Sequence, residues 1–169
     1  MRFPVFVSTP NCLTPKQREV YDFILGELAR HSLEPCTLGQ SHHPTQSPLH
    51  EVMVMARHVC GGVILGFEQF CATDGVNRPG TNRESKLAAP AFFPTPWNQL
   101  EAGILYTVGV PLLIFRERSI TGGIFDQGVS RWFTHMLPQA DELEQHRHVI
   151  ASVIADWRGK VSERFYAIA

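Results

Sequence analysis

Residues 60–67, CGGVILGF, form the stretch that decides the fold. The run is continuously apolar and has the length of one strand, and no charged residue interrupts it. Strands buried on both faces have this composition, and they belong to parallel sheets that helices cover on both sides. A second run, VPLLIF at 110–115, has the same character. Together the two runs predict the centre of a parallel sheet.

Shorter strands and amphipathic helices alternate with these two runs along the chain. Helix starts are indicated by Thr14-Pro15, Ser47-Pro48 and Thr95-Pro96, because a hydroxyl N-cap followed by proline favours a first helical turn. Alternation of strands and helices predicts an α/β fold, here a flavodoxin-like three-layer sandwich with a five-stranded parallel sheet of order 2-1-3-4-5. The expected strands lie at about 3–8, 33–37, 60–66, 110–115 and 132–136.

Two segments have less regular patterns. Residues 68–96 are rich in Gly, Asn, Pro and Thr, which predicts a long irregular loop that is mobile or insertion-like and borders the ligand site. Residues 138–167 have a helical pattern that fits either one long helix or a helix broken at Gly159.

Composition limits the class of protein. The 169 residues are 44% hydrophobic and 18% charged with a net charge of −1, which predicts one globular domain over 1–169 and no duplex nucleic acid as partner. The N-terminus does not have the pattern of a signal peptide, and no apolar run approaches the roughly 20 residues of a membrane span. The cysteines form no CxxC pair, which favours a reduced, cytoplasmic compartment; they are Cys12, Cys36, Cys60 and Cys71.

The histidines are scattered, with His42 and His43 in a polar loop, and they do not form a recognisable ligand set with the cysteines. We therefore expect no metal site and no bound cofactor. The chain also lacks the GxGxxG and GxxxxGK[ST] patterns of the Rossmann and P-loop phosphate sites.

Candidate binding residues follow from the predicted sheet order. The order reverses between the first and third strands, and ligands of such folds bind beyond the carboxyl ends of those strands. Ser8, Thr9 and Asn11 follow the first strand, and Phe67 and Glu68 follow the third. The first three offer hydroxyl and amide groups for a sugar or phosphate; the alternative is that they cap and turn the chain.

Glu101 lies near the start of the helix expected at 97–108, directly before the second buried strand. One interpretation is a helix acid that offsets the helix dipole, and the other is a functional group at the mouth of a pocket. Trp97 and Asn98 add a flat ring and an amide beside it, as in a nucleoside or nicotinamide pocket.

At these residues the chain resembles a known group. PVFVSTP (4–10), PLHEVMVMARHVCGGVILGF (48–67) and above all PWNQLEAGILYTVGVPLLIF (96–115) are similar to the nucleoside 2-deoxyribosyltransferase-like family and the related TIR-like domains. The resemblance covers most of residues 3–116. Its motif is a helical Glu followed by Gly, Gly and Pro, and in this chain these are Glu101, Gly103, Gly109 and Pro111.

The resemblance implies an N-glycosidase, hydrolase or transferase, that acts on a nucleoside, nucleotide or NAD through Glu101. The carboxylate would act at C1′ of the ribose as nucleophile or as counter-charge, with NAD a substrate and not a cofactor. Relatives of this size commonly pair to complete a pocket, so the resemblance implies a homo-oligomer. Two alternatives stay open: a non-catalytic sensor of a nucleotide-derived signal, and an interaction domain that uses the apolar stretch FDQGVSRWF (125–133).

Overall fold

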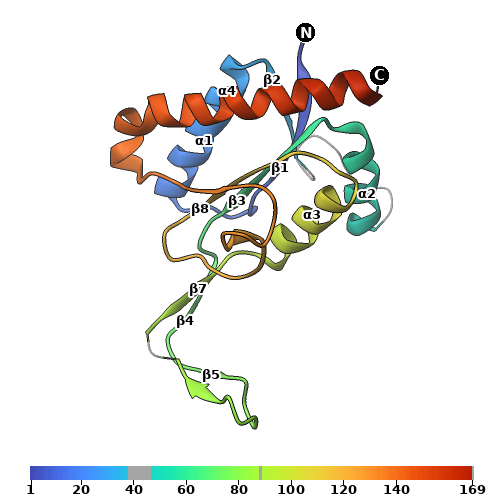
Figure 1. Ribbon diagram of the computed structural model, residues 1–169. Helices are drawn as coiled ribbons and strands as arrows, with labels where there is room; N and C mark the ends of the chain where they lie inside the picture. The colour runs from blue at the N-terminus through green and yellow to red at the C-terminus, as the bar shows by residue number, and fades with distance from the viewer. Residues whose placement is uncertain (38–46, 88, 169) are drawn as a thin grey trace.

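The computed structural model describes residues 1–37, 47–87 and 89–168, and its centre is a five-stranded parallel sheet (Figure 1). The strand order is β2-β1-β3-β8-β9. Because every neighbouring pair in this sheet runs parallel, all the carboxyl ends lie at one edge. The predicted flavodoxin-like arrangement of order 2-1-3-4-5 is confirmed. Its strands are β1 (Phe3–Ser8), β2 (Leu33–Cys36), β3 (Gly61–Gly66), β8 (Leu112–Arg116) and β9 (Thr134–Met136).

Helices cover both faces of the sheet and complete the three layers. Helices α1 (Pro15–Arg30) and α4 (Leu143–Ile168) pack on one face, and α2 (Pro48–His58) and α3 (Pro96–Thr107) pack on the other (Figure 1). Each side has its own apolar core, one around Val63 and Leu65 and the other around Ile64. The alternate side chains of β3 therefore enter both cores, as the continuous apolar run predicts.

Two glycines of β3 allow neighbouring side chains to approach the strand closely. A Cβ atom on Gly61 would lie 2.6 Å from the ring of Trp157 in α4. A Cβ atom on Gly66 would lie 2.5 Å from the ring of Phe125, in the short 3₁₀ helix η1 (Gly123–Phe125). Both distances are below any real Cβ contact, so the glycines of this strand are required by packing.

Helix α4 is continuous, so the alternative of a break at Gly159 is wrong. It begins at Leu143, after the one-turn helix η2 (Ala140–Glu142), and runs through Gly159 to Ile168. The cost of one glycine in a helix is about 1 kcal/mol. Burial of Trp157 and Val161, on either side of Gly159, exceeds that cost.

The segment 68–96 forms a projecting β-arm with paired strands. The prediction that this segment is irregular is therefore wrong. Two antiparallel ladders pair its ascending and descending halves, and Figure 1 shows the arm extending away from the sheet. The pairing was missed because the partners Phe70 and Phe93 are far apart in sequence and no tight hairpin signal joins them. The ladders are β4 (Phe70–Ala72) with β7 (Ala91–Phe93) and β5 (Val76–Asn77) with β6 (Ser85–Lys86).

The predicted polar loop GQSHHPTQS (39–47), with His42 and His43, lies outside the described residues apart from Ser47, which precedes α2. Within the described part of the chain, none of the helices combines the length and the apolar character that crossing a bilayer requires.

Candidate functional site

The first turn of α3 fixes the side chain of Asn98. Thr95 is the N-cap, and its hydroxyl accepts a hydrogen bond from the backbone N–H of Asn98 at 3.4 Å. The same hydroxyl donates to Oδ1 of Asn98 at 3.0 Å. Because Oδ1 is held in this way, the amide nitrogen of Asn98 is turned toward the sheet. Capping and side-chain orientation are therefore set by the same Thr95-Pro96 start that the sequence indicated.

Asn98 connects the helix to two neighbouring strands. Its Nδ2 donates to the hydroxyl of Ser8 at 2.8 Å and to the carbonyl of Leu65 at 3.4 Å. Ser8 is the last residue of β1, and Leu65 lies near the end of β3. The sheet order reverses between these two strands, so the bonds gather at the expected ligand-binding position.

Glu101 lies one turn further along α3, on the same side as Asn98 and Ala102. Its side chain is 9% exposed, and burial raises the pKa of its carboxyl group from 4.5 to about 7. A hydrogen bond with Ser8 opposes part of that rise. Ser8 therefore interacts with both α3 residues, and we call these three side chains the Ser8–Asn98–Glu101 cluster.

The other predicted binding residues lie outside this cluster. The hydroxyl oxygen of Thr9, next to the cluster in sequence, is buried and has no hydrogen-bond partner in the described part of the chain. Asn11 is exposed, and Trp97 is 43% exposed at the start of α3. Phe67 is fully buried in the core beneath α1 and α4, so its side chain is a packing element. The cluster thus contains Ser8, Asn98 and Glu101 from the predicted set.

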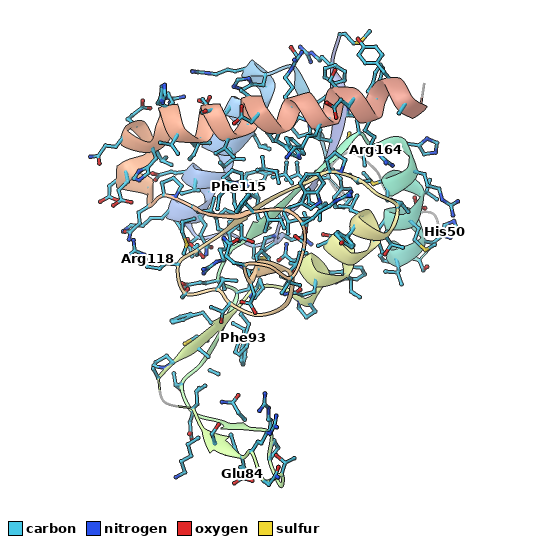
Figure 2. The ribbon with its side chains drawn as sticks, viewed as in Figure 1. His50, Glu84, Phe93, Phe115, Arg118 and Arg164 are labelled. Atoms are coloured by element: carbon cyan, nitrogen blue, oxygen red, sulfur yellow. The ribbon has the colours of Figure 1, made fainter. Side chains whose placement is uncertain are left out.

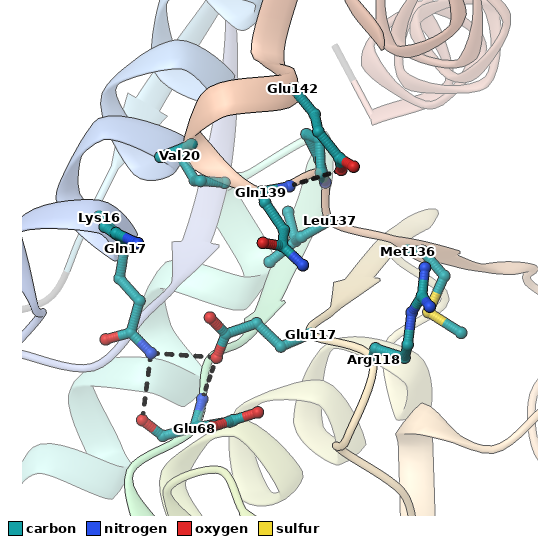
Figure 3. Close-up of a pocket in the computed structure, with 12 residues that line it drawn as sticks. Lys16, Gln17, Val20, Glu68, Glu117, Arg118, Met136, Leu137, Gln139 and Glu142 are labelled. Carbon is teal, nitrogen blue, oxygen red and sulfur yellow. Dashed lines mark hydrogen bonds between the residues drawn. The ribbon is translucent and has the colours of Figure 1, made fainter.

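Glu68 lies in a second environment at the same edge of the sheet (Figure 3). It lines a cavity of about 230 Å³ between the carboxyl ends of β3, β8 and β9 and the first turns of α1. Its side chain accepts a hydrogen bond from the hydroxyl of Ser119. Its backbone N–H donates to Glu117 at 2.5 Å, and Gln17 donates to the same Glu117 oxygen at 3.0 Å.

Glu117 therefore joins three elements at this cavity. Burial raises the pKa of its carboxyl group, while the bonds from Glu68 and Gln17 act in the opposite direction. Sequence reasoning missed both Gln17 and Glu117. Glu117 lies two residues after the apolar run 110–115 and directly after β8, so its position at a carboxyl end was a usable signal. Gln17 is the N3 residue of the capping box that begins at Thr14. This local role does not indicate the contact of its side chain with Glu117.

Gln99 anchors the loop that follows β8. Its Oε1 accepts from the backbone N–H of Ile124 at 3.0 Å, and its Nε2 donates to the carbonyl of Gly122 at 3.2 Å. Gly123 has φ of +61°, and a Cβ atom there would lie 2.3 Å from Gln99. The loop is thus held against the same helix that carries Asn98 and Glu101.

The described residues contain no group of three or more His, Cys, Asp and Glu side chains that could hold a metal ion. Comparison with protein-family models, with curated proteins and with solved structures found no match.

Proposed function

We propose that the protein cleaves an N-glycosidic bond in a nucleoside, a nucleotide or NAD, with Glu101 as the catalytic carboxylate. The single observation that carries the proposal is the buried Glu101 beside Ser8, at the point where the sheet order reverses. Cleavage develops positive charge at C1′ of the sugar. A carboxylate in a site of low dielectric stabilises that charge far more strongly than one in water.

The protonation of Glu101 also supports the proposal. With a pKa of about 7, the carboxyl group exists in both forms at neutral pH. The ionised form can act as nucleophile or counter-charge, and the protonated form can donate a proton to a leaving base. Catalytic carboxyl groups have pKa values near the working pH for this reason.

The test is incubation of the protein with NAD and with a panel of nucleosides and nucleotides, with the released base separated by chromatography. Glu101→Gln keeps the shape of the side chain and removes its charge. We expect it to lower the rate by roughly a hundredfold to a thousandfold, as for loss of one electrostatic group. Glu19→Gln, the same change on an exposed position of α1, is the matched control and should keep the wild-type rate. Absence of base release from every substrate would reject the enzymatic proposal.

A second candidate is a sensor that binds a nucleotide-derived ligand without cleaving it. The observation that favours it is that Ser8 and Asn98, the other two side chains of the cluster, are both neutral. Neutral donors are sufficient for binding. A thermal-shift panel with the same ligands separates the two candidates: a sensor gives a shift without base release, and Glu101→Gln then changes the affinity alone.

A further inference from the structure

A basic groove lies at the amino edge of the sheet, opposite the Ser8–Asn98–Glu101 cluster. It has a volume of about 520 Å³ and lies between the loop that precedes β8, the residues that precede β9 and the C-terminal half of α4. Figure 2 labels Arg164 at this edge and Arg118 at the carboxyl edge, on the far side of the molecule. The lining residues of the groove precede β8 and β9 or lie in α4, whereas Ser8 ends β1, so the groove is separate from the proposed catalytic site.

Two cations stack on one indole ring in this groove. The guanidinium carbon of Arg131 lies 4.9 Å from the ring centroid of Trp132, and the ammonium nitrogen of Lys160 lies 4.8 Å from it. Both distances are within the range of cation–π attraction. Arg131 lies in the segment before β9 and Lys160 lies in α4, so cations from two separate elements contact the same ring.

A third cation is held in place by the backbone. Arg164 donates from Nη1 to the carbonyl of Gly109 at 3.2 Å and from Nε to the carbonyl of Val59 at 3.5 Å. These neutral acceptors orient the guanidinium, and Arg164 forms no ion pair with any residue in the described part of the chain. Among the described residues that line the groove, Glu163 is the one acidic side chain. Three cations thus face one carboxylate, on a chain whose net charge is −1.

The positive charges of the groove lack acidic partners within the described ranges. Neither Arg131 nor Lys160 forms an ion pair with any described residue. Because both charges lie close to one ring, they are within about one Debye length of each other, roughly 10 Å in 0.1 M salt, and they repel. An anion that contacts both cations reduces this repulsion and gains charge-assisted hydrogen bonds.

We propose that this groove binds a small phosphate-bearing molecule, whose anionic groups contact Lys160, Arg131 and Arg164. Multiple negative oxygens match three separate cationic donors better than one carboxylate does. The chain has a net charge of −1 and so no excess of basic residues, which favours a free phosphorylated molecule over a nucleic-acid backbone.

The experiment is calorimetric titration of the full chain with pyrophosphate, in about 50 mM salt to limit screening. We expect Lys160→Gln and Arg131→Gln each to weaken binding by roughly tenfold or more, as for a charged hydrogen bond. Lys86→Gln, which removes the same charge from an exposed position on the β-arm, is the matched control and should change the affinity less than twofold. Tryptophan fluorescence should change on binding, and Trp132→Phe should abolish that change.

Three results would overturn the proposal. The first is no binding of pyrophosphate by the wild-type protein at millimolar concentration. The second is an equal loss in Lys86→Gln and Lys160→Gln, which would mean unspecific charge attraction. The third comes from a parallel titration with a single-stranded oligonucleotide: tighter binding than pyrophosphate, lost in Lys160→Gln, would assign the groove to a polymer. None of these results depends on glycosidic cleavage, so the groove is tested independently of Glu101.

Discussion

Asn98 donates a hydrogen bond of 2.8 Å to the hydroxyl of Ser8, and both side chains are 1% exposed. The bond joins residues that are 90 positions apart in the sequence. It fixes the start of α3 to the end of β1, which places Glu101 over the reversal of the sheet order. The position of the proposed catalytic group therefore depends on this pair of neutral residues.

Asn98→Ala should destabilise the protein by about 2–3 kcal/mol, because it leaves the carbonyl of Leu65 and the hydroxyls of Ser8 and Thr95 without this partner. The measurement is urea unfolding. A double-mutant cycle with Ser8→Ala should give a coupling of about 1 kcal/mol. Asn82→Ala, at an exposed position of the arm, is the matched control and should change stability by less than about 0.5 kcal/mol. Additive effects of the two cluster changes would contradict the bond.

Gly66→Ala tests the close packing of η1 on β3. The added Cβ would lie 2.5 Å from the fully buried ring of Phe125, so we expect a loss of about 2–3 kcal/mol by overpacking. Phe125→Leu removes ring atoms, and the double variant should therefore lose less stability than the sum of the two single variants. Gly103→Ala is the control, since a Cβ there meets no atom within 4 Å and alanine favours a helix. It should leave stability unchanged or raise it.

Arg147→Met tests the connection between α4 and α1. Arg147 pairs with Glu27, which is 2% exposed, and its guanidinium lies 4.8 Å from the ring centroid of Phe23. Loss of the cation leaves Glu27 buried with only the more distant Arg30 at 3.6 Å, so we expect a cost of about 2–4 kcal/mol in thermal or urea unfolding. Adding Glu27→Gln should recover much of it, because the unpaired charge is then absent. No recovery would mean that packing on Phe23 dominates.

The sequence predicts the sheet well because its information there is local. A continuous apolar run such as 60–67 can be satisfied only by burial on both faces, and this determines the position of the strand and the layers around it. The cluster was predicted for a related reason. Sheet order determines which strand ends meet, and on this basis the sequence predicts that Ser8 and Glu101 lie at the same site.

The remaining features depend on contacts between distant residues that no local pattern encodes. Gln17 reaches Glu117 across 100 positions, and the arm pairs Phe70 with Phe93 without a tight turn between them. The solvent exposure of individual side chains could not be predicted from the sequence either. Trp97 and Phe67 are both aromatic residues near the site, but one is largely at the surface and the other is in the core. An apolar residue at a strand end is compatible with either position, and only the packing of neighbouring elements decides between them.

The pH dependence of stability provides a test of Glu101 that needs no substrate. Below pH 4.5 the carboxyl group is protonated in the folded and unfolded states alike. Between pH 4.5 and about 7 the unfolded chain ionises while native Glu101 keeps its proton, so the native state binds more protons. The contribution of Glu101 to the free energy of unfolding therefore falls as pH rises through this window, by about 3 kcal/mol in all.

Glu101→Gln cannot ionise and should not show that loss. We expect its free energy of unfolding, relative to wild type, to increase by about 3 kcal/mol between pH 4 and pH 8 in urea titrations. Ser8→Ala should extend the window to higher pH, because the Ser8 hydrogen bond lowers the Glu101 pKa and its loss raises that pKa further. A difference between Glu101→Gln and wild type that stays constant with pH would mean that native Glu101 ionises like an exposed carboxyl group. Such a result would contradict a buried catalytic carboxylate at position 101, even with the fold unchanged.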